Sequence, residues 1–288
     1  MTASVVRLFS EGEQPLQETH LHTNDPGLFG PNSVSWKVMG DVSSFVGGVR
    51  ALLLQALHPE VAAGVADHSQ YKTDPLGRLN RTSFFVTTVN YGAMPEVQEA
   101  VAVVRAAHKP VSGTSERGIA YSANQPQLGA WVQNTLTDSF LDAYQNFCQP
   151  LEPKDADRFV LEQSKIGELL GISELPLTAR ELREWITEHP QLGSSEALRQ
   201  AWTFLQKPPL QPSQLLGYRI VRAAAVSTLP TNLAVLANAS SPRGSFFAGR
   251  RLIASLRWAL KHSPSWKAAL DRCGAPYDAR TFRSFEDR

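Results

Sequence analysis

The sequence predicts an all-α fold, and three observations support that prediction. Apolar residues recur at a helical period of three to four along most of the chain. Prolines stand where these periodic segments begin or end, which are the positions that helices tolerate. No segment shows the alternation of apolar and polar residues, bounded by hairpin signals, that is typical of β-strands.

The first helices are expected after an irregular N-terminal segment. Residues 1–34 are rich in turn formers and should wrap the surface. A wide apolar stripe predicts a helix over 42–57, with a glycine pair suited to close packing. His58-Pro59 ends this helix, and Pro59 suits the first turn of the next one.

Caps and prolines mark the remaining helices. Asp74 and Pro75 have the residue types of an N-cap and a first turn, and Pro110 stops the helix that begins near Pro95. We expect one domain over 35–275 and a polar tail over 276–288. Further helices are expected from Pro126 onward and over 153–170, 178–189, 195–206, 212–238 and 245–261.

The composition is that of a soluble globular protein. The chain has 288 residues, 42% of them hydrophobic and 19% charged, with a formal net charge of +1. This balance argues against a disordered chain or a nucleic-acid binder. Cys148 and Cys273 have no metal-ligand spacing, so free thiols are expected. No signal peptide and no membrane span is visible, and the expected location is cytoplasmic.

A histidine continues one apolar stripe of the helix before Pro110. Val97, Val101, Val104 and His108 stand at offsets of 0, 4, 7 and 11, so the imidazole should project into the core. Two interpretations remain open. The ring could be a core histidine bonded to a backbone carbonyl, the commoner case for a lone histidine, or an axial ligand of a metal or haem iron.

An arginine and a threonine share a largely apolar stripe one helix earlier. Arg78 and Thr82 lie one turn apart in line with Phe85 and Val89, and Arg81 lies beside them. A guanidinium on such a face needs an anionic partner. The partner could be a ligand carboxylate such as a haem propionate, or one of the acidic residues Asp67, Asp74 and Glu96.

Three short motifs occur in order and carry a resemblance to a known family. They are H-P at 58–59, D-P-x-G-R-x-x-R-T at 74–82 and R-x-x-H-x-x-V-x-G at 105–113. With "YSANQPQLGAWVQNTLTDSFLDAYQ" and "IGELLGI", they resemble the catalytic domain shared by bacterial rubber oxygenases (latex-clearing proteins) and the fungal oxygenase of mycophenolic acid biosynthesis. The resemblance runs from about Trp36 to Gly171, and more weakly through "LLGYRIVRAAAVSTLP".

The resemblance implies a globin-like helical core around one haem b. His108 would occupy the position of the proximal iron ligand, and Arg78 and Thr82 the family's catalytic positions in the haem pocket. His58 matches the H-P element, where capping, packing and haem contact are all possible. Members of the family add oxygen, from dioxygen or peroxide, across or beside carbon-carbon double bonds of isoprenoid chains.

Two residues depart from the family pattern. Arg81 stands where the rubber-cleaving enzymes have a lysine that can bind the distal side of the iron, and a guanidinium is a poor iron ligand. Gln133 replaces a histidine of many bacterial relatives. Because no export signal is visible, extracellular rubber is not the expected substrate.

The leading hypothesis is a haem b-dependent oxygenase that uses dioxygen or peroxide on a small hydrophobic, unsaturated or isoprenoid-like substrate. In it, His108 holds the iron, Arg78 and Arg81 bind propionates or a polar substrate end, and Thr82 offers a distal hydroxyl. One alternative is a non-catalytic helical carrier or sensor of haem or lipid. Another is a cofactor-free interaction protein.

Overall fold

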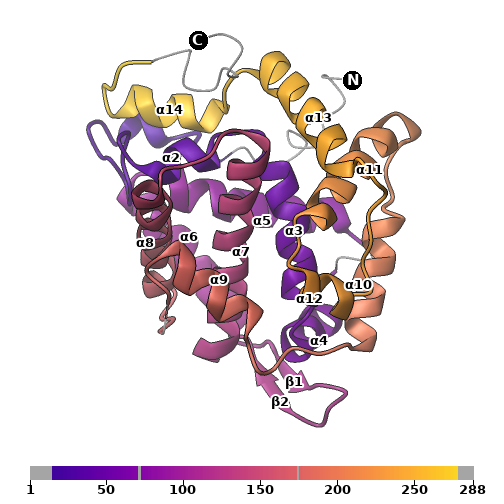
Figure 1. The fold of residues 1–288 in the computed structure, drawn as a ribbon. Helices are drawn as coiled ribbons and strands as arrows, with labels where there is room; N and C mark the ends of the chain where they lie inside the picture. The colour runs from indigo at the N-terminus through magenta and orange to yellow at the C-terminus, as the bar shows by residue number, and fades with distance from the viewer. Residues whose placement is uncertain (1–14, 71–72, 174, 278–288) are drawn as a thin grey trace.

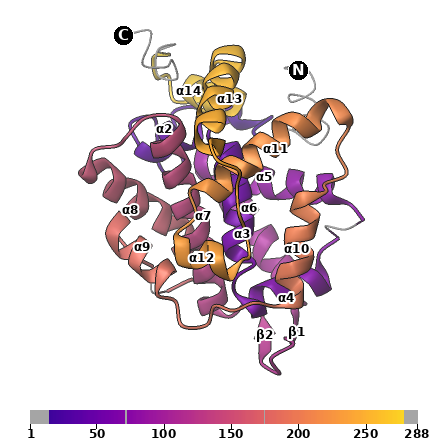
Figure 2. The ribbon, with the colours of Figure 1, turned by 45° about the vertical axis from the view of Figure 1, so that its right-hand side comes forward.

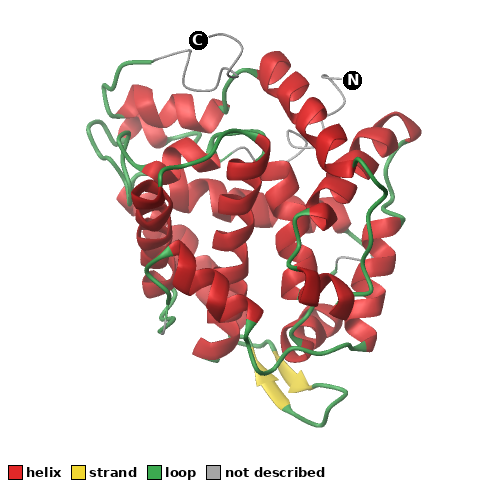
Figure 3. Cartoon of the chain, viewed as in Figure 1, coloured by secondary structure: helices red, strands yellow, loops and turns green. Residues whose placement is uncertain are grey.

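The computed structural model describes residues 15–70, 73–173 and 175–277, and it confirms the all-α fold (Figures 1 and 3). One short 3-10 helix and a small hairpin accompany the α-helices in these ranges. The elements are η1 (Thr19–Leu21), α2 (Val34–Met39), α3 (Ser44–Gln55), α4 (Pro59–His68), α5 (Pro75–Tyr91), α6 (Met94–His108), β1 (Ser112–Thr114), β2 (Ala120–Ser122), α7 (Pro126–Phe147), α8 (Pro153–Leu169), α9 (Ala179–Thr187), α10 (Glu196–Gln206), α11 (Pro212–Ser227), α12 (Thr231–Leu236), α13 (Ser245–Leu260) and α14 (Pro264–Arg272).

The long helix α7 lies at the centre, with α3 packed along it and α8, α9 and α13 also in contact (Figures 1 and 2). Its side chains are buried along most of its length, including several polar ones. The largest apolar cluster contains Trp131 and Tyr144 of α7 together with residues of α2, α3, α8, α9, α10 and α12. A second cluster joins α3 and α7 to α11 and α13.

The hairpin β1–β2 was not predicted from the sequence. Its strands pair antiparallel with Gly113 opposite Tyr121, and the hairpin packs on α4. The Nε2 atom of His68 lies 2.9 Å from the Ser112 carbonyl oxygen, and the Ser115 hydroxyl donates to Glu60 over 2.7 Å. Strands of three residues are too short to show the alternation by which strands are recognised.

Three helix predictions need correction. Helices α2 and α14 were not expected, and each has a serine N-cap whose side chain accepts from a backbone amide. The helix expected over 212–238 is two helices, because Pro230 interrupts it before α12 begins. The polar tail from 276 lies mostly outside the described residues, and a globin-like core and the division into domains stay predictions.

Within the described residues, no helix is long and apolar enough to span a bilayer.

Candidate functional site

Most of the predicted site residues lie on α5 and α6, which are joined by Gly92 and Ala93. The helices are buried at this junction, where a Glu96 carboxylate oxygen accepts from the Ala93 amide at 2.7 Å and the Thr19 hydroxyl at 2.8 Å. Away from it, neither residues 75–87 of α5 nor 102–108 of α6 include a buried side chain. The far ends of the two helices are therefore open, and Arg78, Arg81, Thr82 and His108 all lie there.

His108 is the last residue of α6, and the expectation that its ring enters the core is wrong. Val97 is 0% exposed and Val101 is 7% exposed, whereas His108 is exposed. The same stripe of α6 is therefore buried at Val97 and Val101 and exposed at His108. The reason is that the last two turns of α6 extend beyond the elements that cover its first half.

The imidazole of His108 has the protonation state that a metal ligand needs. Its backbone carbonyl accepts from the Val111 amide and the Asn124 side chain, but its ring makes no hydrogen bond within the described part of the chain. Although the ring reaches solvent, partial loss of hydration lowers its pKa from the ordinary value of 6.5. The lowered pKa favours the neutral ring, which keeps a nitrogen lone pair.

Arg78, Arg81 and Thr82 form a polar group near the start of α5. Arg81 pairs with Asp74 at 3.3 Å, and Asp74 also caps the helix by accepting from the Gly77 amide at 2.9 Å. The Arg81 side chain is 64% exposed, so this pair is weak. The Thr82 hydroxyl donates to the Arg78 carbonyl at 3.0 Å, and Arg78 itself is half-buried.

The other acidic residues considered as partners of Arg78 have roles elsewhere. Asp67 accepts a hydrogen bond from the Tyr121 hydroxyl at 2.5 Å, which ties α4 to β2. Glu96 is committed to the junction of α5 and α6.

His58 lies in a different part of the molecule, at the N-cap of α4. It is 1% exposed, its Nε2 atom lies 3.0 Å from the Gln191 side-chain oxygen, and its Nδ1 atom faces Glu60 at 3.3 Å. Its ring packs against Trp131 and His189, and burial lowers its pKa. These contacts favour a packing role, and contact with a haem stays a prediction.

Gln133, the second departure from the family pattern, is a buried core residue of α7. Its amide donates to the Gln163 carbonyl of α8 at 3.1 Å. Its side chain therefore joins two helices, and its neutral amide does this without a titratable group.

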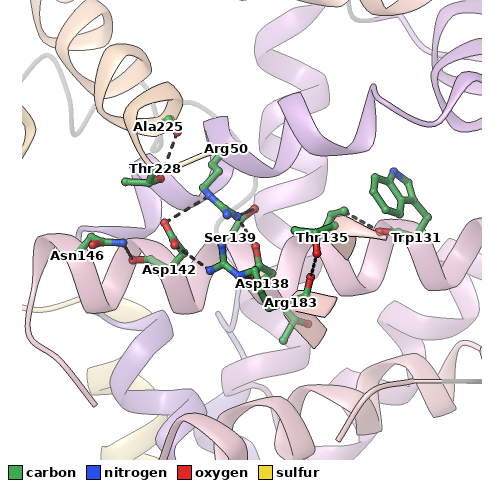
Figure 4. Close-up of polar contacts among 12 residues, drawn as sticks. Arg50, Trp131, Thr135, Asp138, Ser139, Asp142, Asn146, Arg183, Ala225 and Thr228 are labelled. Carbon is green, nitrogen blue, oxygen red and sulfur yellow. Dashed lines mark hydrogen bonds and ion pairs between the residues drawn. The ribbon is translucent and has the colours of Figure 1, made fainter. Parts of the chain in front are cut away.

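A buried charge network was missed by the sequence analysis (Figure 4). Arg50 of α3 is 0% exposed and binds Asp138 at 2.6 Å and Ser139 at 3.0 Å. Arg183 of α9 completes it, with nitrogen atoms 3.2 Å from Asp138 and 3.0 Å from Asp142. The signal in the sequence is a pair of aspartates four residues apart in an apolar helix, because buried acids require partners.

The open ends of α5 and α6 include side chains of the types that hold a haem. No group of three or more metal-binding side chains occurs in the described ranges. A haem iron needs only one or two such donors, because the porphyrin supplies four nitrogens, and a neutral histidine is a common one. Arginines are well suited to bind carboxylates such as propionates. A cavity of about 230 Å³ between α2 and α14 is lined by other residues.

A family model described as "ER-bound oxygenase mpaB/B'/Rubber oxygenase, catalytic domain" matches residues 36–258. No curated protein and no solved structure matches the chain significantly. The family match confirms the resemblance that the three motifs carry and extends it into α13, as far as Trp258. Since it covers more than three quarters of the sequence, the chain belongs to the family of mpaB/B' and rubber oxygenase catalytic domains, and it is an oxygenase domain.

Proposed function

We propose that the protein is a haem b-dependent oxygenase in which His108 is the axial ligand of the iron. The observation that carries this proposal is that His108, the histidine of the R-x-x-H-x-x-V-x-G motif, lies at the open end of α6, where its ring has no hydrogen bond within the described residues. A histidine ligand donates its other ring N–H to a carbonyl, a carboxylate or water, and the exposed His108 ring can use water for this. The oxygenase family supplies the reaction class.

The side chains of α5 would bind and orient the cofactor and the substrate. Arg78 and Arg81 carry permanent positive charge and can bind propionates or a polar substrate end. Thr82 uses its proton to bond the Arg78 carbonyl, so its oxygen lone pairs remain free to accept a hydrogen bond. Bound haem b would supply the redox chemistry with oxygen that these side chains cannot perform.

We further propose a small, hydrophobic, unsaturated or isoprenoid-like substrate, with dioxygen or peroxide as the oxidant, and a cytoplasmic location. Phe85 and Val86 of α5 and Val104 of α6 are half-buried apolar residues on the helices that carry the polar site residues. They would give an apolar substrate a surface to contact and would exclude water from it.

The absorption spectrum of the purified protein tests the proposal. We expect a Soret band and a pyridine haemochrome spectrum of haem b, either as purified or after haem is added. A protein that shows no Soret band after haem is supplied would refute haem dependence and leave the oxygenase family assignment intact.

His108→Ala tests the assigned ligand. We expect it to reduce haem retention at least tenfold, since the bond from the protein to the iron is lost. The matched control is His20→Ala, which removes an exposed histidine outside α5 and α6 and should retain haem as the wild type does. Imidazole added to a His108→Gly variant should restore part of the spectrum. If His108→Ala keeps haem with an unchanged spectrum, another residue is the ligand.

A further inference from the structure

The C-terminal third of the chain has an unusual charge distribution. Between Glu196 and Asp271 the sequence contains no aspartate or glutamate, but it contains ten lysines and arginines. The formal net charge of the whole chain is only +1, so the rest of the molecule carries the compensating acids. Helices α11, α12 and α13 lie in this acid-free segment.

Helix α13 presents an exposed aromatic and basic face. Trp258 is 82% exposed and Phe247 is 69% exposed. With Arg251 and Ala254, both also exposed, they occur at offsets of 0, 4, 7 and 11, which places all four within an arc of about 60°. We call these four residues the Trp258 face. Exposed Arg250 and Lys261 lie at its edge.

The opposite side of α13 holds the helix on the protein. Gly249, Ile253 and Leu256 are buried there against α11 and α7. A side chain added at Gly249 would lie 2.5 Å from Ala224 of α11, so the two helices approach closely. In Figures 1 and 2, α13 lies along the upper edge of the molecule. The Trp258 face is therefore an exposed strip on a firmly packed helix.

The basic residues of this strip have no acidic partner in the part of the chain that the structure describes. Arg257, on the buried side, binds Asp41 at 2.6 Å, but no ion pair is found for Arg243, Arg250, Arg251 or Lys261 among the described residues. Their charge is therefore available to an anionic partner.

We propose that α13 binds the surface of an anionic lipid bilayer. An amphipathic helix with arginines beside large aromatic side chains lies in the plane of a membrane interface. Its aromatic rings enter the boundary between headgroups and acyl chains, and its basic groups meet anionic headgroups. Single-stranded nucleic acids are bound in basic grooves lined by stacking aromatics, whereas the Trp258 face is the exposed side of a single helix and fits a planar partner better. The proposal is independent of haem binding.

Sedimentation of the full-length protein with large unilamellar vesicles tests the proposal. We expect binding to vesicles of about 30% phosphatidylserine in phosphatidylcholine. Binding to pure phosphatidylcholine should be at least tenfold weaker, and 0.5 M salt should weaken binding to anionic vesicles, because the attraction is largely electrostatic. No binding to anionic vesicles would overturn the proposal.

Two variants locate the surface. Phe247→Ala with Trp258→Ala removes the aromatic rings, and Arg250→Glu with Arg251→Glu reverses two charges. Each variant should reduce binding to anionic vesicles at least tenfold. The charge reversals should do so because each basic residue near the membrane contributes about fivefold to the affinity. The loss of both rings should do so because it removes the large apolar groups that enter the interface. All four side chains are exposed, so folding should persist, and circular dichroism checks it.

Matched controls lie on the exposed side of α8. Lys154→Glu with Lys165→Glu makes the same change in net charge, and Leu161→Ala removes an apolar side chain that is 48% exposed. Both should bind vesicles as the wild type does. Equal losses in the α8 and α13 variants would overturn the proposal. The proposal would also be overturned if the wild type bound DNA but not vesicles. It would be overturned as well if the wild type were a dimer that dissociated only in the variant with Phe247→Ala and Trp258→Ala.

Discussion

At the scale of residues, two histidines are held uncharged within one aromatic cluster. The ring of His189 lies 4.9 Å from that of Trp131, 4.8 Å from that of Trp185 and 5.4 Å from that of His58. Loss of hydration, and then repulsion from His58, lower the pKa of His189 to about 4. Loss of hydration also lowers the pKa of His58, although Gln191 and Glu60 oppose that effect.

These pKa values predict that acid destabilises the fold. In the unfolded chain His189 binds a proton below about pH 6.5, whereas in the folded protein it does so only near pH 4. Its contribution to stability is therefore complete above pH 6.5 and is lost as the pH falls from 6.5 to 4. We expect the free energy of unfolding in urea to fall by about 2 kcal/mol between pH 7 and pH 5 on account of this ring.

His189→Phe keeps an aromatic ring without a titrating group, so it should flatten this part of the pH profile. The same slope in the wild type and in His189→Phe would show that other groups cause the acid sensitivity.

At the scale of elements, the contact between α3 and α7 depends on one glycine of an adjacent pair. A Cβ atom at Gly47 would lie 2.8 Å from the Phe140 ring and 3.0 Å from the Ser139 carbonyl oxygen. A Cβ atom at Gly48 would meet nothing within 4 Å. The sequence indicates that the pair suits close packing, and the structure shows which member makes the contact.

Alanine substitutions at these glycines should have opposite effects. Gly47→Ala should destabilise the protein by about 1–3 kcal/mol, because the new methyl group overlaps α7. Gly48→Ala should be neutral or stabilise by up to about 1 kcal/mol, since alanine favours the helix. Urea denaturation measures both, and equal effects of the two variants would contradict the packing argument.

The charge network of Arg50, Asp138, Asp142 and Arg183 joins α3, α7 and α9. Asp138 is almost fully buried. Arg50→Ala therefore leaves the carboxylates of Asp138 and Asp142 without the positive charge of Arg50 that helps to neutralise them. We expect a loss of about 3–5 kcal/mol in the free energy of unfolding. Arg199→Ala is the control: its pair with Glu196 is 63% and 56% exposed, and its loss should be below about 1 kcal/mol. A small loss for Arg50→Ala would mean that the acids take up protons or water instead.

At the scale of the whole molecule, the core and the proposed site differ in how deeply their side chains are buried. The largest apolar cluster extends from α2 to α12, whereas the outer ends of α5 and α6 have no buried residue. A ligand bound at those ends would therefore add contacts to the least covered part of the helices that carry the site.

Haem should consequently raise the melting temperature of the whole protein. A ligand at a hundred times its dissociation constant stabilises the folded state by about 2.7 kcal/mol. For a protein of this size, that corresponds to roughly 5–10 °C. Differential scanning fluorimetry with added haem measures the shift, and His108→Ala should lose most of it. An unchanged melting temperature in the wild type would contradict specific binding.

The sequence by itself determined the helical class and most helix positions, because apolar period, caps and prolines act locally. It also predicted the family, since the motifs around Arg78, Thr82 and His108 are continuous in the chain. It did not predict the hairpin, whose three-residue strands carry too little pattern, or α2 and α14, which the sequence analysis did not recognise.

Only the tertiary structure decided how much of each apolar helix face is buried. His108 shares a helical face with Val97, but the neighbouring elements end before they reach it, so the same face is buried at one end and open at the other. The partners of Arg50 and the exposure of Trp258 likewise depend on which helices meet. Periodicity identifies the side of a helix, whereas burial depends on elements distant in the sequence.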